Sequence, residues 1–68
     1  MTRITIYTNS EEHQFIVNME RRKVYNQINF SEELGKTCHV LDTQGRDVYI
    51  NVSKADFIIL EDVLEGEE

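Results

Sequence analysis

One pair of neighbouring residues, Cys38 and His39, has the side-chain types of a nucleophile and its general base. A catalytic thiolate needs an imidazole within hydrogen-bonding distance of its sulfur. If the segment that contains the pair is a strand, consecutive side chains point to opposite faces and the two groups diverge. We therefore expect Cys38 to be a small buried residue, and we predict no catalytic residues.

The same cysteine and the histidines are also possible metal ligands, with Glu12 beside His13 as an acidic partner. Their spacing matches no zinc pattern, because the chain has one cysteine and no short Cys-x-x-Cys or His-x-x-His pair. Gly35, Gly45 and Gly66 are isolated, so the chain contains no phosphate-binding loop of the P-loop or dinucleotide type. The sequence predicts no metal and no cofactor.

A second set of residues combines aromatic and basic side chains, as surfaces that bind single-stranded nucleic acid do. Tyrosines on outward faces of strands are also enriched in contacts between protein subunits, and we favour that interpretation. The predicted interaction surface consists of Arg3, Tyr7, Arg21, Arg22, Lys23, Tyr25, His39 and Tyr49.

The element that must position Cys38 and His39 is a hairpin around the turn at 42–45. Its sequence, Asp-Thr-Gln-Gly, places Asp at the first position of a type I turn and Gly at the fourth. A type I turn followed by a left-handed glycine is a common three-residue hairpin loop. The register that this loop predicts sets three pairs opposite one another: Asp42 and Arg46, Val40 and Val48, and Cys38 and Ile50.

A two-residue loop is the alternative to this register. It would set Leu41 opposite Val48 and His39 opposite Ile50, which mixes polar with apolar residues on one face. Because a slip of one residue turns every side chain to the other face, a buried face specifies the register strongly. We therefore expect the three-residue loop.

Around the hairpin, apolar and polar residues alternate at the period of two that is typical of half-buried strands. Ile4 and Ile6, for example, alternate with more polar neighbours. A short helical turn near 31–35 would end at a glycine stop. The chain is thus predicted to be mainly β, a five- or six-stranded antiparallel barrel or roll. The predicted strands are 3–8, 14–19, 23–30, 37–42, 46–52 and 57–62.

Two of these segments have a helical alternative. In place of the strand at 14–19, a helix could begin at Ser10 as its N-cap and have Arg21–Lys23 at its negative end. The apolar side chains of that helix would scatter around its axis. Ser53 resembles the first residue of a capping box that would open a helix over 54–65 and give an α+β fold. Acidic residues would then lie at the negative end of that helix. The four consecutive apolar residues from 57 instead favour a strand covered on both faces.

Sixty-eight residues make one small domain, which we assign to 1–64, followed by an acidic tail at 65–68. A domain this small buries only roughly 60% of its unfolded surface, so self-association would add useful burial. One cysteine excludes an internal disulfide and favours a reducing compartment. With no apolar segment suited to a signal peptide or a membrane span, we expect a cytoplasmic protein.

The net charge of −6 argues against a general nucleic-acid binder, whose affinity comes from neutralising phosphates. We therefore expect a small, acidic, non-enzymatic interaction or regulatory protein that self-associates and binds another protein. An inhibitor or modulator of a nucleic-acid-acting protein is one form of this hypothesis. The alternative is a small barrel that binds single-stranded nucleic acid through its basic and tyrosine side chains.

Overall fold

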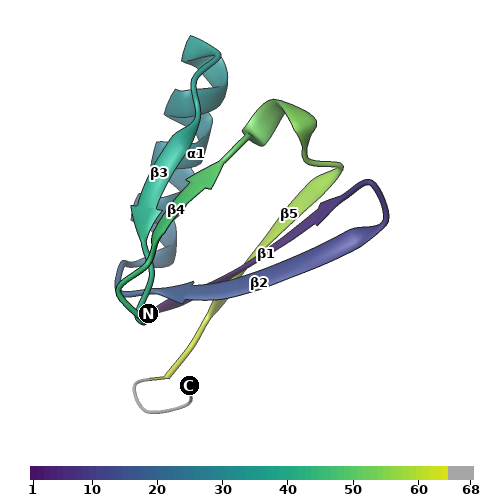
Figure 1. Cartoon of the computed structure of the whole chain (residues 1–68). Coiled ribbons are helices and arrows are strands. Elements are labelled where there is room, and N and C mark those ends of the chain that lie inside the picture. The colour runs from purple at the N-terminus through teal and green to yellow at the C-terminus, as the bar shows by residue number, and fades with distance from the viewer. Residues whose placement is uncertain (65–68) are drawn as a thin grey trace.

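The computed structural model describes residues 1–64, which form five strands, one α-helix and one short 3₁₀ helix. In chain order these are β1 (Thr2–Thr8), β2 (Glu11–Val17), α1 (Arg21–Leu34), β3 (Cys38–Leu41), β4 (Asp47–Ile50), η1 (Val52–Lys54) and β5 (Phe57–Asp62). One antiparallel sheet has the order β2-β1-β5, and β3 and β4 form a separate hairpin (Figure 1). The described chain is mainly β as predicted, but its two sheets do not close into a barrel.

The hairpin of β1 and β2 turns through two residues, Asn9 and Ser10. Both have positive φ, 52° and 68°, as in the type I′ turn that suits the twist of a tight hairpin. Ser10 is therefore not in the extended conformation that a helix N-cap needs, and the helix weighed for this segment does not form. The predicted strand at 14–19 is confirmed as a strand, but it begins and ends earlier, at Glu11–Val17.

The predicted strand at 23–30 is wrong, because this segment lies within α1. Val24, Ile28 and Ser31 are its buried residues, and their spacing of four and three places them on one stripe of a helix. In a strand, Phe30 would share a face with Val24 and Ile28, yet this side chain is 63% exposed. The side chains that pack into the core are therefore those that a helix, and not a strand, places on one face.

The helical turn predicted at 31–35 is the last turn of α1. Gly35 ends the helix at φ 66°, in the left-handed region. Its N–H donates to the carbonyl of Glu32 at 3.1 Å, and the N–H of Lys36 donates to the carbonyl of Ser31 at 2.9 Å. These two bonds form a Schellman motif, in which glycine avoids the steric penalty of positive φ.

The β3–β4 hairpin has the register that its turn predicted. Cys38 lies opposite Ile50 and Val40 lies opposite Val48. Both strands are shorter than the predicted 37–42 and 46–52. The inward residues are buried or half-buried and the residues between them are exposed, so one face of the hairpin packs against the core.

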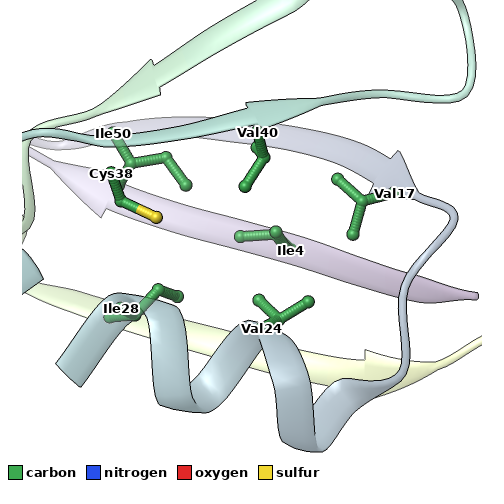
Figure 2. Close-up of a cluster of buried hydrophobic side chains, with 7 residues drawn as sticks. All are labelled: Ile4, Val17, Val24, Ile28, Cys38, Val40 and Ile50. Carbon is green, nitrogen blue, oxygen red and sulfur yellow. The ribbon is translucent and has the colours of Figure 1, made fainter. Parts of the chain in front are cut away.

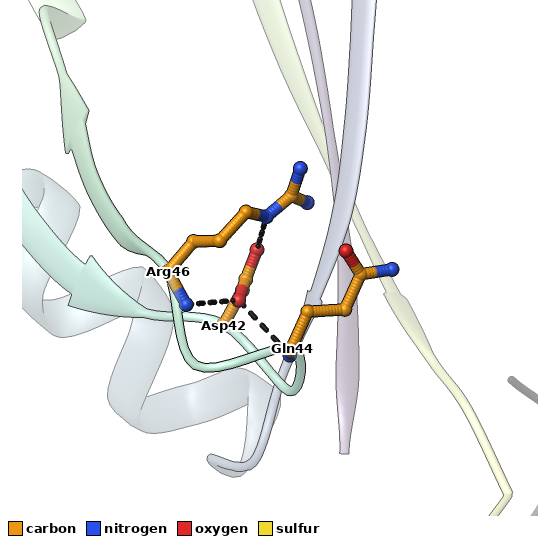
Figure 3. A network of polar contacts seen from close by, with 3 residues as sticks. All are labelled: Asp42, Gln44 and Arg46. Atoms are coloured by element: carbon orange, nitrogen blue, oxygen red, sulfur yellow. Dashed lines mark hydrogen bonds and ion pairs between the residues drawn. The ribbon is translucent and has the colours of Figure 1, made fainter.

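Asp42 organises the turn of this hairpin through a buried carboxylate (Figure 3). Its Oδ1 accepts hydrogen bonds from the backbone N–H groups of Gln44 at 3.0 Å and Arg46 at 2.8 Å. Its Oδ2 accepts one from Arg46 Nε at 2.6 Å. Burial by itself raises the pKa of Asp42, but the hydrogen bonds from Arg46 and Gln44 and the guanidinium charge hold that pKa below its ordinary value.

The core lies between the inner face of the three-stranded sheet, α1 and the β3–β4 hairpin. Figure 2 shows Ile4 at its centre, with Val24 and Ile28 of α1 on one side and the hairpin residues on the other. The buried hydrophobic cluster consists of Ile4, Val17, Val24, Ile28, Cys38, Val40 and Ile50. All are small or medium side chains, so the core is narrow and several larger apolar residues remain exposed.

The C-terminal strand predicted at 57–62 is confirmed as β5, which pairs antiparallel with β1. The alternative helix over 54–65 is wrong for its described part, because the chain passes from η1 into this strand. The predicted acidic tail at 65–68 lies outside the described residues. No helix within residues 1–64 combines the length and apolar character needed to cross a membrane.

Candidate interaction surfaces

The eight predicted surface residues lie on three parts of the molecule. Arg3 and Tyr7 lie on the outer face of β1, His39 and Tyr49 on the outer face of the β3–β4 hairpin, and Arg21, Arg22, Lys23 and Tyr25 on α1. Arg21, Arg22 and Tyr25 line one groove together, whereas the hairpin pair belongs to another element. The structure thus divides the predicted surface into three.

The hairpin pair forms a small exposed cluster. The rings of His39 and Tyr49 stack with their centres 4.7 Å apart, and His39 Nε2 lies 3.0 Å from Asp47 Oδ1. Cys38 points to the other face and is 3% exposed, so the sulfur and the imidazole diverge as the register predicted. Among residues 1–64, no three His, Cys, Asp or Glu side chains are grouped as metal ligands.

The outer face of the three-stranded sheet mixes aromatic and charged side chains. Tyr7 stacks on Phe57 with ring centres 4.4 Å apart. Partial burial raises the pKa of Tyr7, and the carboxylate of Glu12 on the neighbouring strand raises it further. Arg3 lies 3.9 Å from Glu61. This face therefore has paired charges and no run of one sign.

β5 is an edge strand whose second side has no strand neighbour in the described structure. The N–H of Val63 donates to the carbonyl of Met1 at 3.0 Å. Because hydrogen bonds alternate along an antiparallel pair, the backbone groups of Ile59 also face β1. Those of Ile58 and Leu60 must then point to the free side, where they are available to another strand.

The side chains of β5 are apolar on both faces of the sheet. Phe57 and Ile59 are 55% and 41% exposed on the outer face. Ile58 and Leu60 are half-buried on the inner face, against the core. Exposed edge strands are usually protected by lysine, proline or a bulge, and 57–60 contains neither of these residues. The edge is therefore suited to pairing.

A groove runs between β5 and α1. It consists of two adjoining hollows of about 670 and 290 Å³, which share Tyr25, Ile58 and Leu60. Glu20, Arg21, Arg22 and Asp62 line one end, and Ile28, Asn29, Glu32, Val52, Ala55 and Phe57 line the other. The inner side of the β5 edge is thus open to apolar side chains from outside.

Sequence reasoning missed Ile58 and Leu60 as surface residues. The four consecutive apolar residues at 57–60 did indicate a strand that is apolar on both faces. We interpreted both faces as covered by the rest of the fold. The three basic residues Arg21, Arg22 and Lys23 also have a position that the sequence did not predict. They lie at the positive end of α1, where cations are unfavourable. Asp62 of β5 lies 3.7 Å from Arg21 Nε and offsets part of this effect.

A cleft of about 610 Å³ separates β4 from the hairpin of β1 and β2. Its apolar lining includes Ile6, Phe15, Val48 and Ile50. Its polar lining includes Thr8, His13, Gln14, Arg46, Asp47, Tyr49, Asn51 and Lys54. The cleft lies between the two sheets, which do not close into a barrel.

No family model, curated protein or solved structure matches this chain. A function must therefore follow from the free strand edges, the groove and the cleft themselves.

Proposed function

We propose that this protein is a non-enzymatic interaction module that self-associates by pairing β5 of one copy with β5 of a second copy. The observation that supports this proposal is the unpaired β5 edge, which is apolar on both faces. Antiparallel pairing about a two-fold axis would join two three-stranded sheets into one six-stranded sheet. Exposed apolar edges of this kind readily pair with another chain.

The charges on β5 distinguish the registers that a two-fold axis allows. A pairing centred on Ile59 would set Asp56 opposite Asp62 of the second copy, and like charges directly opposite one another are destabilising. A pairing centred on Leu60 avoids this opposition. Both registers use the backbone groups of Ile58 and Leu60, which already point to the free side, so the charges decide between the two. We therefore favour the register centred on Leu60.

The groove beside β5 supports the same arrangement. In the Leu60-centred register, Leu60 of each copy lies against the other on the groove side of the joined sheet. Tyr25, which is 57% exposed at the groove, would then be covered in part. The pairing would thus bury apolar surface that the narrow core of one copy leaves open.

Sedimentation velocity tests this proposal with a matched pair of variants. Ile58→Lys places a charge in the groove beside the free edge, whereas Leu41→Lys adds the same charge to β3, at a residue that is 57% exposed. We expect wild type and Leu41→Lys to dimerise at micromolar concentrations and Ile58→Lys to remain a folded monomer by circular dichroism. A wild-type monomer at high concentration, or dimerisation of Ile58→Lys, would contradict the proposal.

Disulfide cross-linking tests the register. Residues directly opposite in a hydrogen-bonded antiparallel pair have Cα atoms roughly 5.5 Å apart, which a disulfide can span. Under mild oxidation, Leu60→Cys should therefore form a covalent dimer and Ile59→Cys should not. The native thiol of Cys38 is 3% exposed and gives no background. Cross-linking of Ile59→Cys alone would shift the axis to that residue.

Single-stranded nucleic-acid binding has less support. Its candidate residues lie on three parts of the molecule, and two of its cations, Arg3 and Arg21, lie within 4.0 Å of the carboxylates of Glu61 and Asp62. Binding to nucleic acid would have to break these ion pairs. A gel-shift assay at low salt checks the alternative, and we expect no shift of single-stranded RNA or DNA.

A further inference from the structure

The cleft between β4 and the β1–β2 hairpin supports an inference that is separate from pairing through β5. We propose that this cleft accepts an extended strand from a partner protein. The strand has apolar residues at alternate positions and a carboxylate that reaches Lys54. Its backbone pairs with β4, and its apolar side chains cover the floor of the cleft, a mode known as strand addition.

The first wall of the cleft is the free edge of β4. The N–H of Asp42 donates to the carbonyl of Arg46 at 3.0 Å, which fixes the alternation of hydrogen bonds along the hairpin. Val48 is then bonded to β3, and the backbone groups of Asp47 and Tyr49 point away from it. Within residues 1–64 no other strand pairs with this side of β4.

The second wall is the edge of β2. Here the carbonyl of Ile16 accepts a hydrogen bond from the N–H of Thr43 at 2.8 Å, which joins β2 to the turn of the other hairpin. By the same alternation, the backbone groups of Glu12 and Gln14 also point to this edge. No strand of the described chain pairs with them. Figure 1 shows β4 and β2 diverging from the turn.

The floor of the cleft is apolar. Ile6, Phe15 and Val48 pack against the core on one side and remain half-exposed on the other. In an added strand, side chains alternate between two faces, so every second residue would lie on this floor. That geometry calls for apolar residues at alternate positions of the partner.

The charges at the rim identify the remaining feature of the partner. Arg46 is occupied by Asp42, at 2.6 Å. Lys54 forms no ion pair with any residue of 1–64, and its carbonyl accepts the hydroxyl of Thr8 at 3.0 Å, which holds its backbone at the rim. A carboxylate on the partner would therefore meet a cation that has no ion pair within residues 1–64, at the end of the cleft remote from the turn.

A strand fits these features better than a small apolar molecule does. A small molecule would cover Ile6 and Phe15 but would leave the backbone groups of the β4 edge bonded only to water. The main chain of an extended peptide can satisfy these groups, and its side chains can cover the same floor. The free edge of β4 together with the apolar floor thus favours a peptide.

The experiment uses the full chain carrying Ile58→Lys, so that pairing through β5 does not contribute. The probe is a fluorescein-labelled heptapeptide in which valine and threonine alternate and the last residue is aspartate. We expect saturable binding by fluorescence anisotropy. A control peptide that ends in lysine should bind at least about tenfold more weakly, a difference of about 1.4 kcal/mol. Lys54→Glu should reverse this preference.

Two substitutions at one position test the role of the backbone. Tyr49→Pro removes the N–H that points into the cleft and spares the bonds to β3, since proline is tolerated where an edge N–H faces outward. Tyr49→Thr keeps the N–H and removes the ring. We expect Tyr49→Thr to bind the peptide and Tyr49→Pro, if its circular dichroism is unchanged, to lose binding.

Several outcomes would overturn the proposal. These are no binding of either peptide, equal binding by the two variants of Tyr49, or no dependence on the charge at Lys54. If the Ile58→Lys chain instead self-associates and Tyr49→Pro prevents it, the occupant is a second copy. Failure of the β5 proposal leaves this test intact, because the two use different edges.

Discussion

The Asp42–Arg46 turn and the β5 edge differ in how their backbone polar groups are satisfied. In the turn, a buried carboxylate accepts two backbone N–H groups and a guanidinium. At the β5 edge, the backbone groups of Ile58 and Leu60 have no strand partner in the described chain. A closed network stabilises the fold of one chain, whereas an open edge supplies binding energy to another. Substitutions in the two regions should therefore separate folding from association.

The largest expected effect is that of Asp42→Asn on stability. The amide keeps one acceptor but sets an NH₂ group against the Arg46 guanidinium and removes the buried charge that pairs with it. We expect a much lower free energy of unfolding by urea denaturation, with unchanged association of the molecules that remain folded. Asp47→Asn on the exposed face is the control, and it should change stability by no more than about 0.5 kcal/mol.

The effect of Asp42→Asn on the free energy of unfolding should depend on pH. Because the pKa of Asp42 is lowered by folding, its contribution is fully present above the unfolded-state pKa of about 3.9 and is lost as pH falls through the lower folded-state value. The difference in unfolding free energy between wild type and Asp42→Asn should therefore shrink below about pH 4. A difference that stayed constant from pH 7 to pH 2 would show that the network is not the cause.

Amide hydrogen exchange should show an intermediate effect at the β5 edge. At low protein concentration the N–H groups of Ile58 and Leu60 should exchange rapidly, because they point to the free side of the strand. At concentrations that favour the dimer they should become at least about tenfold more protected. The N–H of Ile59, which faces β1, is the internal control and should be protected throughout. Protection of Leu60 that does not depend on concentration would count against pairing through this edge.

Gly45→Ala should have the smallest effect. Gly45 has a φ of 80°, and no atom beyond its two chain neighbours lies within 4 Å of the position that an added Cβ would take, so the backbone conformation is what opposes alanine. We expect a loss of about 1 kcal/mol, or roughly 4–8 °C in Tm for a domain of this size. Gly45→Asn should lose less, because asparagine tolerates this conformation, and neither variant should alter dimerisation.

Local chemistry was sufficient to predict the hairpin. The hydrogen bonds that fix its register lie within the five residues from Asp42 to Arg46, so no distant element is needed to choose it. The same reasoning separated Cys38 from His39. The strands β1 and β5 were also predicted, from short apolar patterns that match their observed bounds closely.

The segment at 23–30 shows where local patterns fail. Val24 and Ile28 are compatible with either a strand or a helix, and Phe30 favoured the strand. The decision comes from packing, because Val24 and Ile28 share one helical stripe that contacts the core around Ile4. Phe30 lies off this stripe and stays exposed. The sequence of 23–30 alone does not favour the helix over the strand.

By itself, the sequence determined the Asp42–Arg46 turn, the small mainly β character and the supply of tyrosine and basic side chains. Only the tertiary structure decided that these side chains divide among three surfaces. It also decided that β5 is the last strand of the β2-β1-β5 sheet. The physical reason is the separation along the sequence of the residues that make the deciding contacts. A turn is closed by hydrogen bonds between near neighbours, whereas strand order and coverage depend on contacts between β1 and β5, at opposite ends of the described chain.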